Sequence, residues 1–278
     1  MAAADAQIGE LERWRAVALG VACHATFLAA IAWMIASLHE GLALGRGRLI
    51  GPAAWAANAA LALSFPLLHS WLLTPRGASA LDRLLADRDG RLRCTTYAFV
   101  ASLHLLVVFG LWSPVGHRIA PAADGILHGL REGLFAGSWV LLARAMYDAG
   151  LDIQSGWLGW SSVVRGRPPR FKAFPTGGLY RFTRQPVYVA FACTLWTSPV
   201  LTTDGLLIAS IWTLYCLLGP LHKEQRLLAR EPARYRTYQA RVPYFLPRLP
   251  RRSRGPLGAG PGPGPDPDPA ADDAGGAA

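Results

Sequence analysis

The sequence predicts an all-α, polytopic helical membrane protein with about six apolar segments, the last two forming a helical hairpin. Hydrophobic residues make up 52% of the 278 residues and charged residues only 17%. Several apolar runs approach or exceed the roughly 20 residues that an α-helix needs to cross a bilayer. Between these runs, Lys and Arg gather in alternate loops, as they do in membrane proteins.

The apolar segments are expected at 15–38, 51–73, 95–115, 125–147, 187–201 and 205–221. The first four, within 15–147, are predicted transmembrane helices. The fifth is short, so it either spans the membrane or forms a shallow re-entrant hairpin with the sixth. No cleavable signal peptide is expected, because the polar start is followed by an apolar run that is too long for the core of such a peptide.

The distribution of basic residues predicts that both termini lie in the cytosol. With 1–14 inside, 23 of the 28 Lys and Arg residues fall in cytosolic segments and three in outer loops. Positive charge is enriched in this way on the inner side of membranes. Topology thus explains the net charge of +10, and nucleic acid is not an expected partner. The Gly-, Pro- and Asp-rich stretch 251–278 is predicted to be a disordered tail.

Polar residues offer few metal ligands. The four cysteines form no Cys-x-x-Cys pair and join no histidine at metal-ligand spacing, so neither a metal nor a disulfide framework is expected. Ionisable residues inside spans are costly and are therefore functional candidates. Arg144 and Asp148 have the spacing of a helical ion pair, and Arg131 and Glu132 are expected near the outer end of their helix.

One polar stretch stands where the fifth segment begins, and it reads Gly177-Gly178-Leu179-Tyr180-Arg181-Phe182-Thr183-Arg184-Gln185-Pro186-Val187-Tyr188. Glycines permit a tight turn or a close approach to a ligand, and Pro186 suits the first turn of a helix. Arg181 and Arg184 beside a helix N-terminus could hold the carboxylate of a small zwitterionic ligand. The same charges would also serve as a simple interfacial anchor.

This stretch resembles the Gly-x-Tyr-Arg-x-x-Arg-x-Pro-x-Tyr signature of the isoprenylcysteine carboxyl methyltransferase superfamily of integral-membrane enzymes, with Gln185 where His is usual. The second motif of that family is matched by Lys223-Glu224, Tyr235, Tyr238 and Val242-Pro243, with Lys223 in place of a glutamate. The resemblance implies a cytosolic loop, a helical hairpin and a C-terminal cofactor-binding region within 148–250, with S-adenosylmethionine as cofactor. The implied cofactor-binding residues are Gly178, Tyr180, Arg181, Arg184, Gln185, Pro186, Tyr188, Glu224, Tyr235 and Tyr238.

Roles for these residues follow from the chemistry of the cofactor. The arginines suit its carboxylate, Glu224 suits its ammonium or ribose, and the tyrosines suit its adenine or its cationic sulfur. Arg184 and Glu224 are also implied to be catalytic. In the polar loop 148–176, Trp157 and Trp160 would lie at the headgroup level or cover the cofactor.

A histidine near the end of the second apolar segment is the candidate base. Residues 65–71, Phe-Pro-Leu-Leu-His-Ser-Trp, resemble the Gln-His-Ser box of bacterial methanethiol S-methyltransferases and NnrU-like proteins, with Leu68 in place of Gln. A thiol reacts as its thiolate, and the resemblance therefore implies that His69 is catalytic as a general base. A single histidine in a helix is also often a packing residue.

The leading hypothesis is an S-adenosylmethionine-dependent methyltransferase of the bacterial inner membrane, acting on a small or lipophilic acceptor, best a thiol. Its expected partners are that acceptor and the lipid bilayer, with no metal. The alternatives are an isoprenylcysteine carboxyl or phospholipid amine methyltransferase, an NADPH-dependent sterol reductase, and an NnrU-like accessory protein without catalysis.

Overall fold

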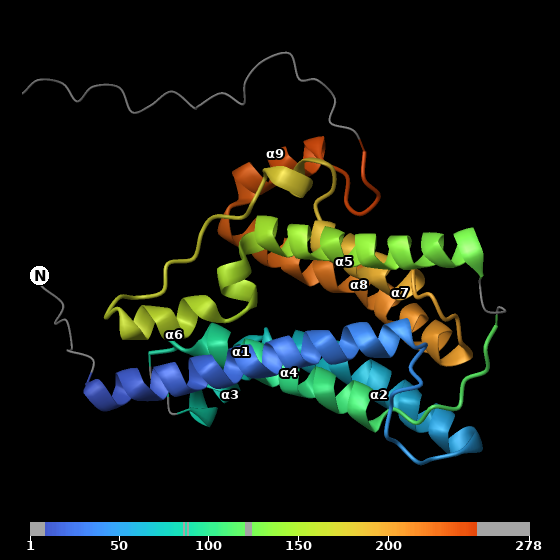
Figure 1. The fold of residues 1–278 in the computed structure, drawn as a ribbon. Coiled ribbons are helices and arrows are strands. Elements are labelled where there is room, and N and C mark those ends of the chain that lie inside the picture. The colour runs from blue at the N-terminus through green and yellow to red at the C-terminus, as the bar shows by residue number, and fades with distance from the viewer. Residues whose placement is uncertain (1–8, 86, 88, 120–123, 249–278) are drawn as a thin grey trace, which may run out of the picture. The chain divides into compact units, whose positions relative to one another are not determined.

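A computed structural model describes residues 9–85, 87, 89–119 and 124–248. The predicted tail at 251–278 and most of the predicted N-terminal segment lie outside these residues. The all-α prediction is confirmed, because the described part of the chain forms helices and no strand (Figure 1). The helices are α1 (Glu10–His39), α2 (Gly51–Leu72), α3 (Pro75–Leu84), α4 (Arg93–Leu111), α5 (Gly125–Gln154), α6 (Trp157–Val164), the 3₁₀ turn η1 (Gly178–Arg181), α7 (Pro186–Trp196), α8 (Thr203–Arg230) and α9 (Pro232–Arg241).

Four of these helices, α1, α2, α4 and α8, are long and apolar enough to cross a membrane. The fourth predicted segment forms α5, which is 30 residues long but carries several charged side chains. The fifth forms the short apolar helix α7, and it packs against α8 as the predicted hairpin requires. Large apolar side chains such as Leu28, Ile126 and Val140 are exposed on α1 and α5, as expected where a surface faces lipid.

Several of the predicted boundaries were wrong. The fifth segment was expected to run to residue 201, but α7 ends at Trp196, and the sixth was expected to end at residue 221, but α8 continues to Arg230. The third segment was expected to run to residue 115, but α4 ends at Leu111, where Ser113 and Pro114 follow outside the helix. The stretch 148–176 was expected to be a loop, but α5 continues into it and α6 lies within it. Gly150, with φ +96°, breaks the helical path between the two parts of α5, a conformation that glycine adopts readily.

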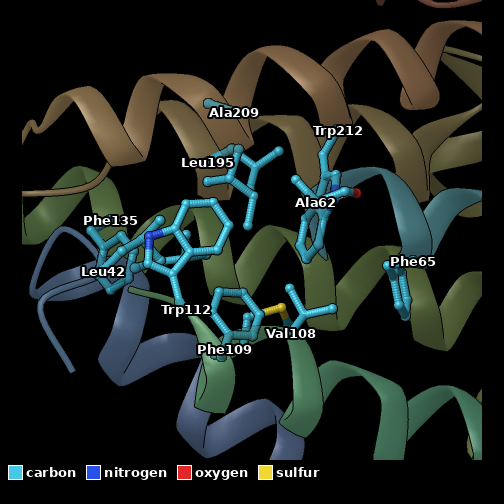
Figure 2. Close-up of a cluster of buried hydrophobic side chains, with 13 residues drawn as sticks. Leu42, Ala62, Phe65, Val108, Phe109, Trp112, Phe135, Leu195, Ala209 and Trp212 are labelled. Atoms are coloured by element: carbon cyan, nitrogen blue, oxygen red, sulfur yellow. Dashed lines mark hydrogen bonds between the residues drawn. The ribbon is translucent and has the colours of Figure 1, made fainter. Parts of the chain in front are cut away.

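Helices from the N-terminal and the C-terminal half of the chain pack against one another. Helix α1 lies along α4 and α6, α2 lies against α8, and α7 lies between α5 and α8 (Figure 1). The main hydrophobic cluster joins α1, α2, α4, α5, α7 and α8 around Trp112 and Trp212, both almost completely buried (Figure 2). The Trp212 ring meets Phe109 edge-on at 5.7 Å between centroids, and its indole N–H donates to the Ala62 carbonyl at 2.8 Å. Burial of these rings therefore fixes α8 against α2 and α4.

A buried polar network, formed by the side chains of Asp204 and Asn58, connects the start of α8 to the segment after α4. The carboxylate of Asp204 is 2% exposed and accepts hydrogen bonds from the backbone N–H groups of Val115 at 3.0 Å and Gly116 at 2.7 Å. Beside it, Asn58 exchanges two hydrogen bonds with the backbone of Ser113. This network supplies hydrogen bonds to backbone groups that have no helical partner, which is the usual condition for their burial.

Asp204→Ala should lower the free energy of unfolding by about 2–4 kcal/mol, because it leaves the partly buried N–H groups of Val115 and Gly116 without their acceptor. The matched control is Asp89→Ala, since Asp89 is exposed and pairs with Arg91 at the surface. Chemical unfolding of the detergent-solubilised protein measures both variants. Equal stability of the two variants would show that the polar network contributes nothing to the free energy of unfolding.

Candidate functional site

The signature stretch, residues 177–188, begins with a turn whose backbone packs directly against the side chain of Asp148. Gly178 has φ +56°, and a Cβ at this position would overlap the Asp148 carboxylate. That carboxylate accepts a hydrogen bond from the backbone N–H of Leu179 at 2.9 Å and pairs with Arg144 at 3.1 Å. The sequence predicted only the Arg144–Asp148 pair. The structure adds that Asp148 orients η1, and thereby Tyr180.

Gly178→Ala should destabilise the protein by about 1–2 kcal/mol and displace η1, because an alanine at this φ is strained and its methyl group meets Asp148. Gly177→Ala is the control, since Gly177 is in the extended region and nothing lies within 4 Å of an added Cβ. Thermal unfolding in detergent compares the two. If both alanines were tolerated equally, the close approach of Asp148 would not matter.

A clamp between Arg184 and Glu224 joins the two motifs that lie 40 residues apart. The guanidinium Nε and Nη2 donate to the two carboxylate oxygens at 2.8 and 3.2 Å, and both side chains are mostly buried. Gln185 and Gln239 also donate to the carboxylate, at 2.9 and 2.8 Å. Each oxygen of Glu224 therefore accepts two hydrogen bonds, as a buried charge requires.

Arg184 also donates hydrogen bonds to backbone carbonyls at the end of the second motif. Its Nη1 donates to the carbonyls of Gln239 at 3.2 Å and Val242 at 3.0 Å, and its backbone N–H donates to the carbonyl of Pro243. The Thr183 hydroxyl lies within hydrogen-bond distance of the carbonyls of residues 244 and 245. The order and spacing of the two motifs thus have a structural reason, because their residues form one hydrogen-bonded unit.

Beside this clamp lies a small cavity of about 20 Å³, enough for about one water molecule. Its walls are mostly aromatic, with two basic side chains, and they consist of Phe174, Pro175, Tyr180, Arg184, Lys223, Leu227, Tyr235 and Tyr238. Burial raises the pKa of Tyr180, Tyr235 and Tyr238, so these phenols stay neutral and can act as hydrogen-bond donors. Tyr238 already donates to the Tyr180 carbonyl at 2.7 Å.

The cavity contains only part of the predicted set. Tyr180, Arg184, Tyr235 and Tyr238 line it, and Glu224 and Gln185 stand behind Arg184. Arg181 is exposed and lies over the Phe182 ring. Pro186 begins α7 as predicted. Three further lining residues had no signal in the sequence, because apolar residues in a loop or on a helix carry no motif; they are Phe174, Pro175 and Leu227.

Trp157 and Trp160 lie elsewhere, against α1. The Trp160 indole donates to His24 at 3.0 Å, and the ring fills the space beside Gly20. Neither ring lines the cavity, so they do not cover it.

His69 belongs to a second polar cluster, between α2, α4, α7 and α8. Its Nε2 lies 2.6 Å from the Tyr97 hydroxyl, and its buried Nδ1 has no hydrogen-bond partner among the described residues. The Tyr215 ring meets His69 at 6.3 Å and Tyr188 at 6.2 Å between centroids. Tyr188, one of the predicted cofactor-binding residues, therefore lies on the His69 side of the signature stretch. Within the described residues, no group of three His, Cys, Asp or Glu side chains could hold a metal.

The fold and these contacts define a class: a helical membrane protein whose C-terminal third closes an aromatic, basic cavity with an Arg–Glu clamp. Comparison with known proteins then relates the chain to named enzymes. It is 31% identical over 156 residues to methanethiol S-methyltransferase 1 of Bradyrhizobium diazoefficiens, covering 55% of this chain and 54% of that protein. It is 30% identical to the methanethiol S-methyltransferase of Pseudomonas deceptionensis, covering 56% and 60%.

A longer match is to the methanethiol S-methyltransferase of Crocosphaera subtropica, at 26% identity over 68% of this chain and 73% of that protein. The chain thus spans about half to three quarters of the length of these curated relatives. The similarity confirms the relationship that the two motifs predict and is consistent with the isoprenylcysteine carboxyl methyltransferase-like family. No protein-family model matches the chain, and no solved structure matches it.

Proposed function

We propose that this protein is a multi-pass membrane methyltransferase that transfers a methyl group from S-adenosylmethionine to a small thiol such as methanethiol. The observation that carries the proposal is the similarity to proteins named methanethiol S-methyltransferases, together with the clamp that unites the two motif halves. Both termini in the cytosol, as the basic residues favour, would place the cavity on the cytosolic side.

The cavity fits one end of the donor. S-Adenosylmethionine supplies, when bound, a methyl group on an electrophilic sulfonium. Ligand pockets usually measure about 300–1,000 Å³. This cavity is far smaller, so it would take only a small group at one end of the donor. The rings of Tyr180, Tyr235 and Tyr238 supply the aromatic walls around that part. The Arg184–Glu224 clamp holds these tyrosines in place, because it fixes both α8 and the segment after α9.

The His69 cluster supplies the base. When Nε2–H donates to the Tyr97 oxygen, the Nδ1 lone pair is free to accept a proton. The Tyr97 hydroxyl lies 3.5 Å from the His69 carbonyl, to which it can donate in turn. The thiol would lose its proton to Nδ1, and the thiolate would form a bond to the methyl carbon as the carbon–sulfonium bond breaks. The products are a methyl thioether and neutral S-adenosylhomocysteine.

Methyl transfer is tested directly with the detergent-purified protein, methanethiol and a donor that carries a trideuterated methyl group. Gas chromatography with mass detection should find dimethyl sulfide that carries the deuterium label. Parallel reactions offer an isoprenylcysteine and a phospholipid amine. Labelling of either one, with none of methanethiol, would overturn the choice of acceptor.

An accessory role without turnover is the second candidate, and one observation favours it. Both oxygens of Glu224 are occupied within the protein, so this carboxylate is not open to a ligand. The same reactions, with calorimetry of S-adenosylhomocysteine beside them, decide between the two candidates, because an accessory protein would bind that ligand and label no acceptor.

A further inference from the structure

Lys223 is the basic group of the cavity that has no counter-charge of its own. It lines the cavity from α8, and its ammonium lies 5.6 Å from the centre of the Tyr180 ring. Among the described residues, no carboxylate lies within ion-pair distance of this ammonium, whereas the neighbouring Glu224 is paired with Arg184. The cavity therefore carries one positive charge that the surrounding protein does not balance.

The two arginines of the signature stretch, Arg181 and Arg184, do not offer hydrogen-bond donors to a ligand in the cavity. The Nε and both terminal nitrogens of Arg184 are used by Glu224 and by the carbonyls of Gln239 and Val242. Arg181 is exposed and does not line the cavity. Of these three basic side chains, that of Lys223 thus lines the cavity and keeps its donors for an anion.

The positive charge of Lys223 also argues against a second arrangement, in which the sulfonium of the donor lies on the Tyr180 ring. An ammonium over the Tyr180 ring already makes the cation–π contact that a sulfonium would need there. A second cation at the same ring would lie close to the charge of Lys223, and like charges at such short range repel each other. The end of the donor that enters this cavity should consequently carry negative charge.

We propose that Lys223 binds the carboxylate of the donor's amino-acid end and so decides which end of the donor enters the cavity. The inference rests on the proposed function, since it assumes a sulfonium donor with an amino-acid end. It gives a purpose to the lysine that stands where the resemblance implies a glutamate. It also leaves the sulfonium outside the face of Tyr180.

Isothermal calorimetry of the full-length protein in detergent tests this with two ligands that differ in one group. They are S-adenosylhomocysteine and its analogue that lacks only the carboxylate. A charge-assisted contact of this kind corresponds to roughly 10- to 100-fold in affinity. The native protein should therefore prefer S-adenosylhomocysteine by about that factor, and Lys223→Met should reduce the preference to less than about threefold.

Two variants serve as controls. Lys223→Arg keeps the charge and should keep the preference, and Lys172→Met removes the chain's other lysine, which is exposed, and should change nothing. Unchanged affinity of Lys223→Met for the decarboxylated analogue would show that the variant is folded. A preference that survives in Lys223→Met would overturn the inference and leave the proposed function standing. No binding of either ligand to the native protein would overturn both.

Discussion

Arg184→Met should lower the free energy of unfolding by about 3–5 kcal/mol, because it leaves the carboxylate of Glu224 buried without its counter-ion. The Glu224 side chain is only 8% exposed. The variant also removes the hydrogen bonds to the carbonyls of Gln239 and Val242, so α9 and the segment after it should loosen. Chemical unfolding in detergent measures the stability, and proteolysis after α8 reports the loosening.

Arg181→Met is the matched control, since it removes the same charge three residues earlier from an exposed side chain. Its effect should stay below about 1 kcal/mol. The double variant Arg184→Met/Glu224→Leu should recover part of the lost stability, because it removes both charges together. Equal losses in Arg181→Met and Arg184→Met would contradict the clamp.

His69→Ala should reduce methyl transfer to an alkyl thiol by about 10²–10⁴-fold, the usual contribution of a general base. An alkyl thiol is mostly protonated at neutral pH and needs the base, whereas an acidic aromatic thiol is already largely a thiolate. The loss should therefore be much smaller for the aromatic thiol. Initial rates with both acceptors, at saturating donor, give the ratio.

His104→Ala is the control for packing, because His104 contacts the same Phe65 ring but bonds to Ser64 instead of Tyr97. It should lower both rates equally and only slightly. Tyr97→Phe removes the hydroxyl that orients His69 and should give a weaker form of the same acceptor-dependent loss. A His69→Ala loss that is equal for both thiols would mean that His69 packs and does not accept the proton.

The class of fold, the positions of the apolar helices and the two motifs could all be predicted from the order of the residues. Apolar runs of spanning length have few alternatives to helices, because a bilayer offers no partners for free backbone groups. Motif residues such as Tyr180 and Arg184 were identified because their spacing is specific. Helix α6 was missed, since its eight residues are too few to show a helical period.

The role of each polar residue, by contrast, depends on contacts that appear only in the folded chain. Arg184 and Arg181 look alike in the sequence, but one is buried in a clamp and the other is exposed. Asp148 orients the signature turn from a distant helix, and Lys223 faces the cavity while its neighbour Glu224 faces Arg184. The physical reason is that charge and hydrogen-bond capacity belong to a residue type, whereas burial and partners depend on segments that only folding brings together.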